Sequence, residues 1–183
     1  MKKLFIATFL FFSFLSQSQT YIKANAFTTL LTIPNVGIET SIGEKSTLQF
    51  DVLGSFWKSI NGNPREFYTF TSEYRYHFKE KHNGFYAGAH IGASAFNFQK
   101  WNYINSDKYE KGFGYFIGST IGYQVKINDK FMIDCYLGGG WHQGFYKGYL
   151  ISTGESYDGA KDYNKSGEWL PYRGGVMVSY KLN

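Results

Sequence analysis

The sequence predicts an all-β protein, an eight-stranded antiparallel up-and-down transmembrane β-barrel, and three observations lead to this prediction. Several stretches alternate residue by residue between apolar side chains and small or polar ones, which is the period of a strand with one apolar face. Short polar turns separate these stretches, and aromatic residues make up 21% of the chain. The N-terminal segment has the features of an export signal.

Residues 1–19 are predicted to be a signal peptide, which leaves residues 20–183 as one outer-membrane barrel domain. Lys2 and Lys3 precede an apolar run over residues 4–15 and a small polar exit over residues 16–19. This is the order of regions in a secretory signal. The apolar run is shorter than the ~20 residues that a membrane-spanning helix needs, so we favour a cleaved signal over a retained helix.

The clearest hairpin covers residues 112–141. Its first strand, 112–127, places aromatic and β-branched side chains on one face and glycine, threonine and other polar residues on the opposite face. The polar turn 128–130 leads into a second alternating strand, 131–141. Each strand is at least as long as the roughly 9–11 residues with which a tilted strand crosses a membrane.

The rest of the mature chain supplies further copies of this unit. The other predicted strands cover residues 22–31, 36–42, 48–56, 68–78, 85–98 and 169–182. Short connections (43–45, 79–84 and 128–130) alternate with long ones (58–66, 99–111 and 147–167), although the first connection, at Pro34, is short. An even strand number and short turns at one end are typical of outer-membrane barrels. Lipid offers no partner to an open sheet edge, so the sheet should close.

The polar face of the strands predicts a charged interior. A lumen charge network is expected from Glu39, Asp51, Glu73, Arg75, Lys126, Asp134 and Arg173, and Lys23, His77, His90 and Lys181 are also assigned to this face. An eight-stranded barrel is just wide enough to be filled by side chains, and buried charges must pair. We therefore expect an ion-paired plug, with a narrow pore or a small-ligand pocket as the alternative. An interior with this many charged residues disfavours a hydrophobic ligand.

A soluble barrel of the lipocalin type is the competing architecture. It would point the apolar face inward and the charges outward, which inverts every assignment made above. The aromatic outer face and the asymmetry of the connections favour the membrane barrel.

Aromatic side chains in the long connections are candidate contacts for a surface partner. These outer-loop candidates are Trp101, Tyr103, Tyr109, Tyr149, Tyr157 and Tyr163. Exposed aromatic residues often anchor recognition, but the same residues also suit an interfacial belt or packing within the loops.

We identify no catalytic, metal-binding or cofactor-binding residues. His90 and Ser94 share a face but lie about 13 Å apart along one strand, too far for a nucleophile and its base. His142 could meet Asp158 or Asp162, so a lipid-modifying enzyme remains a further alternative. The net charge of +5 includes no basic cluster, so no nucleic acid is expected. The single cysteine, Cys135, lies on the apolar face.

The motifs of the mature chain resemble those of the domain-of-unknown-function 3575 family. They are KANAF, PNVGIETSIGEK, SEYRYHF, NGFYAGAHIG, KGFGYFIGSTIGYQ and FMIDCYLGGGW, in that order. The resemblance implies an exported, small outer-membrane β-barrel and carries over no catalytic residue. Residues 147–167 match the family poorly, so a function located in this loop would not transfer.

The expected role is that of an outer-membrane protein, structural or interacting at the surface, with a charge-paired, plugged lumen. Its partners would be outer-membrane lipid and a surface partner bound through the outer loops.

Overall fold

The computed structural model describes residues 19–159 and 161–183, so nearly all of the predicted signal peptide lies outside the described residues. The described chain is all-β apart from the short helix α2 and the 3-10 turn η1 (Trp101–Tyr103). Its strands are β1 (Thr20–Asn25), β2 (Asn35–Ser41), β3 (Ser46–Ser55), β4 (Arg65–His77), β5 (Gly84–Phe98), β6 (Lys108–Lys126), β7 (Phe131–Leu150) and β8 (Asn164–Lys181).

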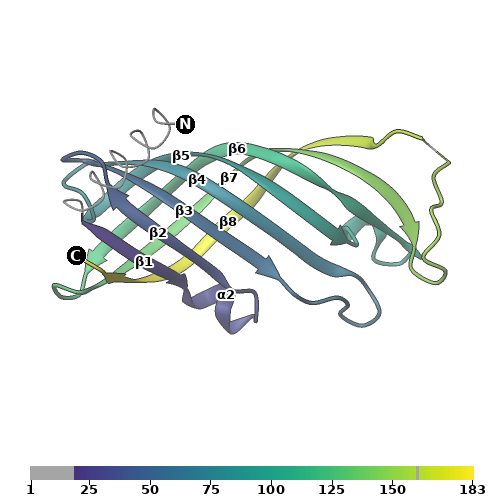
Figure 1. Cartoon of the computed structure of the whole chain (residues 1–183), viewed down its shortest axis with the longest axis horizontal. Helices are drawn as coiled ribbons and strands as arrows, with labels where there is room; N and C mark the ends of the chain where they lie inside the picture. The colour runs from purple at the N-terminus through teal and green to yellow at the C-terminus, as the bar shows by residue number, and fades with distance from the viewer. Residues whose placement is uncertain (1–18, 160) are drawn as a thin grey trace, which may run out of the picture.

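The strands form one antiparallel sheet that closes on itself. Each strand pairs with its neighbour in sequence, and β1 pairs with β8, with Tyr21 opposite Lys181 and Asn25 opposite Met177. Figure 1 shows the resulting elongated ring of tilted strands. The eight-stranded, up-and-down antiparallel arrangement predicted from the sequence is therefore present.

The connections give the two ends of the barrel different characters. The connections 42–45, 78–83 and 127–130 are short and lie at the end that we call the turn end, where Thr20 N donates to Asn183 Oδ1 at 3.1 Å. The connections 56–64, 99–107 and 151–163 are long and lie at the opposite, loop end. The predicted asymmetry is present, although the last loop is shorter than the 147–167 expected.

The first connection differs from the prediction. β1 ends at Asn25, and the residues predicted to continue the strand form the helix α2 (Ala26–Leu30). Asn25 caps this helix, because its Oδ1 accepts a hydrogen bond from Thr28 N at 3.3 Å. Asparagine competes for the backbone in this way at helix N-termini, so the first strand is short and its connection is longer than predicted.

Strands β6 and β7 are longer than predicted. β6 begins at Lys108 and β7 runs to Leu150, so Tyr109 and Tyr149 are strand residues rather than loop residues. They face each other in the β6–β7 ladder, and their rings stack with 5.5 Å between centroids. Such cross-strand aromatic pairs stabilise a sheet and extend this hairpin beyond the alternating core of its sequence.

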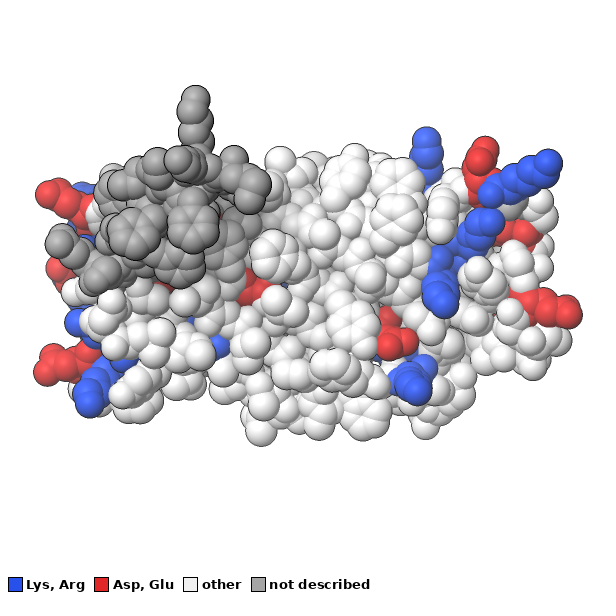
Figure 2. Space-filling model, in the orientation of Figure 1, with Lys and Arg blue, Asp and Glu red and all other residues white. Residues whose placement is uncertain are grey.

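The two faces of the sheet have the polarity expected of a membrane barrel. Large apolar side chains such as Ile91 and Ile121 are exposed on the outside, whereas charged ones such as Glu73 and Arg75 are fully buried inside. In Figure 2 the charged side chains gather mainly at the two ends, and an almost uncharged band separates them. The inverted faces of the soluble alternative are therefore wrong. No described helix is long and apolar enough to cross a membrane.

A bulge in β8 changes which residues face inward. In the β7–β8 ladder Gly138 pairs with Arg173 but Gly140 pairs with Leu170, so β8 has one extra residue here. An extra residue reverses the alternation beyond it. The alternation along residues 169–182 predicts that Leu170 and Tyr172 lie on the outer face with Val176 and Val178. This prediction is wrong, because both residues line the interior, as Arg173 does.

Candidate functional site

The lumen is divided into two parts along the barrel axis. The half near the turn end is filled by a charged cluster, which we define as Lys23, Glu39, Asp51, Glu73, Arg75, Asp134 and Arg173. The half near the loop end contains a pocket with a volume of about 810 Å³.

Lys23 joins three strands at the base of the cluster. Its Nζ lies 2.6 Å from Glu39 Oε2 and 2.5 Å from Asp134 Oδ2, and it also donates to Gln49 Oε1 at 2.9 Å. All three donor positions of the ammonium group are therefore used, as a buried lysine requires.

Arg75 crosses the centre of the lumen. Its guanidinium lies 3.1 Å from Glu73, 3.2 Å from Glu39 and 2.7 Å from Asp134, and its charged carbon lies 4.5 Å from the centre of the Tyr86 ring. The side chain is fully buried. One cation therefore pairs with carboxylates from three different strands, β2, β4 and β7.

Arg173 forms the upper layer of the cluster. Its two terminal nitrogens contact the two carboxylate oxygens of Asp51 at 3.1 and 3.0 Å, and Nη2 also lies 2.7 Å from Glu73. Such a paired contact is the strongest geometry for an ion pair. Glu73 thus links Arg75 to Arg173 and makes the cluster continuous.

The cluster includes every predicted network residue except Lys126. Lys126 lies at the turn end, where its exposed Nζ is 3.8 Å from Glu80. It is the last residue of β6, so its side chain is beyond the enclosed part of the lumen. The prediction that Lys126 joins the lumen network is therefore wrong.

A buried histidine of a short turn extends the cluster toward the turn end. The His82 ring accepts or donates a hydrogen bond with Ser41 Oγ at 2.9 Å, and its Nδ1 lies 3.7 Å from Glu39. Burial lowers the pKa of His82 to about 4, although the Glu39 carboxylate acts in the opposite direction. His82 is therefore neutral at physiological pH.

One glycine provides the space that the cluster needs. A Cβ at Gly88 would lie only 2.3 Å from Glu73 Oε1. A larger residue at this position of β5 would displace the Glu73 carboxylate from Arg75 and Arg173.

The pocket at the loop end has mostly apolar walls. The apolar side chains that line it include Ile33, Leu53, Phe67, Phe96, Phe98, Phe116, Trp169 and Leu170. Small-molecule sites typically have volumes of about 300–1,000 Å³ and mostly apolar walls with placed polar groups, and this pocket also has charged lining residues such as Arg65, Lys100 and Glu168. The interior is therefore not charged throughout, and the argument against a hydrophobic ligand does not apply to this half.

The floor of the pocket is an aromatic layer above the charged cluster. The Phe116 and Tyr172 rings are 4.8 Å apart between centroids, and His90 bonds to Tyr172 through Nε2 at 2.8 Å and to Thr120 through Nδ1 at 3.1 Å. We did not identify Phe116 from the sequence. Its position in the inward phase of β6, between Gly114 and Gly118, was the available signal.

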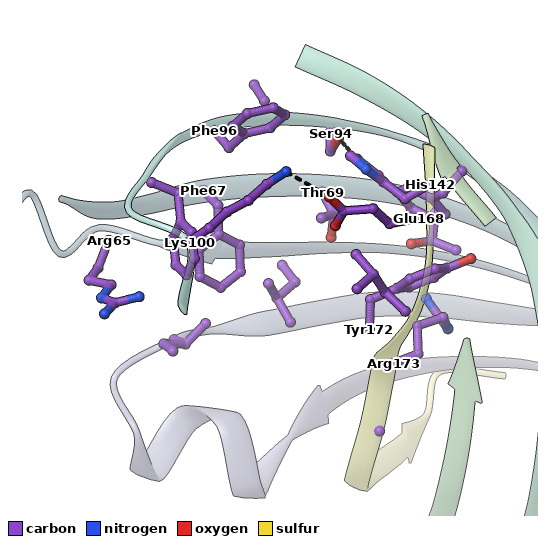
Figure 3. Close-up of a pocket in the computed structure, with 18 of the residues that line it drawn as sticks. Arg65, Phe67, Thr69, Ser94, Phe96, Lys100, His142, Glu168, Tyr172 and Arg173 are labelled. Atoms are coloured by element: carbon purple, nitrogen blue, oxygen red, sulfur yellow. Dashed lines mark hydrogen bonds and ion pairs between the residues drawn. The ribbon is translucent and has the colours of Figure 1, made fainter. Parts of the chain in front are cut away.

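Ser94 and His142 form the polar group of the pocket wall. Ser94 Oγ lies 2.8 Å from His142 Nε2 (Figure 3), whereas His90 has other partners, so the argument against a His90–Ser94 pair is confirmed. The suggested contact between His142 and Asp158 or Asp162 is not observed among the described ion pairs and hydrogen bonds. Asp158 instead accepts from Gly148 N at 2.9 Å.

The Ser94–His142 pair has two of the three groups of a nucleophile relay. Glu168 lies opposite His142 in the β7–β8 ladder, but its carboxylate lies 2.8 Å from Lys100 Nζ. Within the described chain no carboxylate ion-pairs with His142, and a relay needs an acid that orients the base. Nor do His, Cys, Asp and Glu in these parts of the chain form a group of three that could hold a metal ion.

Lys100 bridges the rim of the pocket. It lies 3.2 Å from Glu110 and 2.8 Å from Glu168 (Figure 3), which joins β6 to β8 across the opening. Burial would lower the pKa of Lys100, but its hydrogen bond to Glu168 and its attraction to Glu110 outweigh this effect and raise the pKa. Lys100 is therefore charged and has two carboxylate partners.

The aromatic contact candidates are distributed over different surroundings. Trp101, in η1, is 82% exposed and lines the rim of the pocket. Tyr157 has Lys108 Nζ at 4.8 Å from its ring centre, and Tyr163 packs edge-on against Phe113 at 5.4 Å. Tyr103 carbonyl oxygen accepts from Gln99 Nε2 at 2.8 Å. Packing within the loops thus accounts for several of these residues, and Trp101 is the most exposed.

Comparison with known proteins identifies the family. The family model described as a protein of unknown function (DUF3575) matches residues 3–182. The chain belongs to the DUF3575 family. No curated protein matches the sequence. The family membership confirms the resemblance found in the motifs, and no activity is established for the family.

Proposed function

We propose that this DUF3575 protein is an outer-membrane β-barrel that binds a small, largely apolar ligand in its loop-end pocket and does not conduct ions. The single observation that carries the proposal is the divided lumen. A charged cluster closes one half, and an apolar cavity of about 810 Å³ occupies the other.

The outer wall supports the membrane placement. The outward residues of β6 remain free of charge from Phe113 to Val125. At about 3.3 Å per residue and a tilt of roughly 45°, this stretch covers about 28 Å, close to the apolar band of about 25 Å of outer-membrane barrels. Aromatic pairs flank the band near the turn end, where Phe85 lies 4.6 Å from Tyr123.

The charged cluster argues against a pore. Arg75, Lys23 and Glu39 are fully buried and bonded to one another or to shared partners. An ion could pass only if these pairs separated, and separating buried pairs costs several kcal/mol, about 3–5 for loss of one partner. The proposal therefore replaces the pore alternative with a pocket that opens toward the loop end.

Surface interaction through the loops is the second candidate function. Trp101 carries it, because it is 82% exposed beside the opening of the pocket. Catalysis is not part of the proposal, since the Ser94–His142 pair has no orienting acid within the described chain.

A dye-binding experiment tests the proposal. The barrel in phosphatidylcholine nanodiscs would be titrated with N-phenyl-1-naphthylamine, whose fluorescence rises in apolar surroundings, with empty nanodiscs subtracted. Ser94→Phe fills the pocket and should abolish the dye fluorescence that remains after the signal of empty nanodiscs is subtracted. Ser119→Phe is the matched control, because Ser119 is exposed on the outer wall.

Two further measurements complete the test. Each variant must run as a compact band on a gel until it is heated, which demonstrates a closed barrel. Planar bilayers that contain the protein should remain silent. Equal dye binding by wild type and Ser94→Phe, or steady unit currents, would contradict the proposal.

A further inference from the structure

The strands are short on one side of the barrel, which we call the short side. β1 has 6 residues and β2 has 7, whereas a tilted strand needs about 9–11 to cross a membrane. β8 continues well past its partner, because its ladder with β1 begins at Met177 and the strand itself begins at Asn164. Among the described strands, only β7 pairs with the segment 164–176.

Helix α2 lies where β1 ends and no longer pairs with β8. Figure 1 shows it about midway along the barrel, at the point where β1 ends. Phe27 is 57% exposed, Leu30 83% and Leu31 54%. A helix satisfies its own backbone and is therefore tolerated beside lipid where an open strand edge is not. In the proposed placement, these apolar side chains would face the bilayer.

The pocket reaches this side of the barrel. Its lining includes Thr28 and Ile33 on the α2 side and Leu170 and Gly174 on the β8 side. Asn25 closes the corner below, because its Nδ2 donates to the Gly174 carbonyl oxygen at 3.2 Å. Between α2 and β8 of the described chain, no continuous strand ladder separates the pocket from the surrounding lipid.

The charges that line the pocket differ in their pairing. Lys100 and Arg173 each have two carboxylate partners. Arg65 has no carboxylate within ion-pairing distance in the described chain. Its Nη1 donates to the Gln99 carbonyl oxygen at 2.8 Å, and its guanidinium lies 4.8 Å from the centre of the Phe98 ring.

Arg65 is therefore the cation that remains available to a ligand. A guanidinium group binds carboxylate and phosphate groups through a planar fork of donors. Arg65 is the first residue of β4, at the loop end, and Phe67 follows it on the same inner face. Figure 3 shows Arg65 at one side of the pocket, with Phe67 and Phe96 between it and the deeper residues.

We propose that the loop-end pocket holds a single acyl chain with an anionic head, and that the chain enters sideways between α2 and β8. The head pairs with Arg65, and the chain runs along Phe67 and Phe96 toward the aromatic floor. This inference rests on the proposed function and adds to it the ligand class and the route. An acyl chain of the outer leaflet has this same orientation, with its head at the loop end and its tail toward the midplane.

The ligand class is tested by binding measurements with matched probes. Radiolabelled palmitate, lysophosphatidic acid and hexadecanol would be titrated against the barrel in nanodiscs, with lipid-only nanodiscs subtracted. Arg65→Gln should weaken binding of the acids about tenfold, the size of one charge-assisted contact, and leave hexadecanol unchanged. Lys111→Gln, which removes an exposed cation of the outer wall at the same end, should change nothing.

The outcomes separate this inference from the proposed function. Binding of palmitate alone identifies a free fatty acid as the ligand, and binding of lysophosphatidic acid as well includes the phosphate head of a membrane lipid. Equal affinity of wild type and Arg65→Gln for both acids overturns the anionic head, even where the dye still binds. Loss of dye binding together with all three probes would overturn the pocket itself.

The route is tested by closing the gap. In a Cys135→Ser background, Thr28→Cys and Gly174→Cys would be joined by a short bifunctional thiol reagent, with the unreacted double variant as control. Uptake of palmitate from the bilayer should slow at least tenfold after cross-linking. An unchanged rate, with the gel shift of a folded barrel intact, would show that the chain enters from the loop end instead.

Discussion

Arg75 provides the most direct test of the charged cluster. Its guanidinium contacts Glu39, Glu73 and Asp134, and its side chain is fully buried. The cluster contains one more carboxylate than cations, so Arg75→Met raises this excess by a further charge. Removing one partner from a buried pair costs about 3–5 kcal/mol, and we expect the free energy of unfolding to fall by this amount.

Glu73→Gln is the informative comparison. Without the Glu73 charge, Arg75 keeps Glu39 and Asp134, and Arg173 keeps both oxygens of Asp51. The substitution also balances the charges of the cluster. We therefore expect a loss of less than about 1.5 kcal/mol, the range of an ordinary hydrogen bond.

The double variant Arg75→Met/Glu73→Gln measures the coupling between the two residues. It should be more stable than Arg75→Met alone by about 1 kcal/mol or more, because it removes a buried carboxylate that has lost one of its two cationic partners and so lowers the excess of negative charge. The assay is equilibrium urea unfolding in phosphatidylcholine liposomes, followed by tryptophan fluorescence. Lys126→Met is the control, since its partner Glu80 is exposed, and it should leave the unfolding midpoint unchanged.

Two results would refute this reasoning. If Arg75→Met unfolded at the same urea concentration as wild type, the buried cluster would not hold the barrel together. If Glu73→Gln lowered the free energy of unfolding as much as Arg75→Met, the excess of negative charge would not explain the loss of stability.

Two other predictions concern pH and the outer wall. The pKa of His82 is about 4 in the folded chain and about 6.5 in the unfolded chain, so the unfolded state binds the proton first and stability falls as pH drops from about 6.5 toward 4. Between pH 7.5 and 5, the free energy of unfolding of the wild type should fall by about 2 kcal/mol more than that of His82→Gln in the same urea assay. Equal decreases would contradict a buried neutral His82 ring. Cys135 is exposed on the outer wall, so a water-soluble maleimide should label it in urea but not in liposomes, and rapid labelling in liposomes would contradict the membrane placement.

The strand count, the alternating faces and the asymmetry of the connections are predicted from the sequence alone and are present in the structure. Alternation is local, because successive side chains of a strand point to opposite sides whatever the strand packs against. Residues 68–78 and 85–98 were therefore placed correctly from their pattern alone, and so was the inward direction of Glu73 and Arg75. The outer-membrane location and the signal peptide remain predictions from the sequence.

The contacts between inward residues depend on how the strands pair around the ring. Lys23 and Asp134 are 111 positions apart and touch because the ladders from β1 around to β7 have a particular register. The bulge opposite Gly139 reversed the direction of Leu170 and Tyr172, and no alternating pattern reveals an extra residue of this kind. Lys126 fell outside the cluster because its strand ends there.

The pocket depended on closure of the sheet. Ser94, Lys100, His142 and Glu168 come from separate segments and form one wall only once the ring is complete. The short side of the barrel also depends on closure of the sheet. It results from the cap that Asn25 places on α2 and from the difference in length between β1 and β8. Local patterns specify strands and faces, whereas register, bulges and unequal strand lengths decide where the lumen is filled and where it stays open.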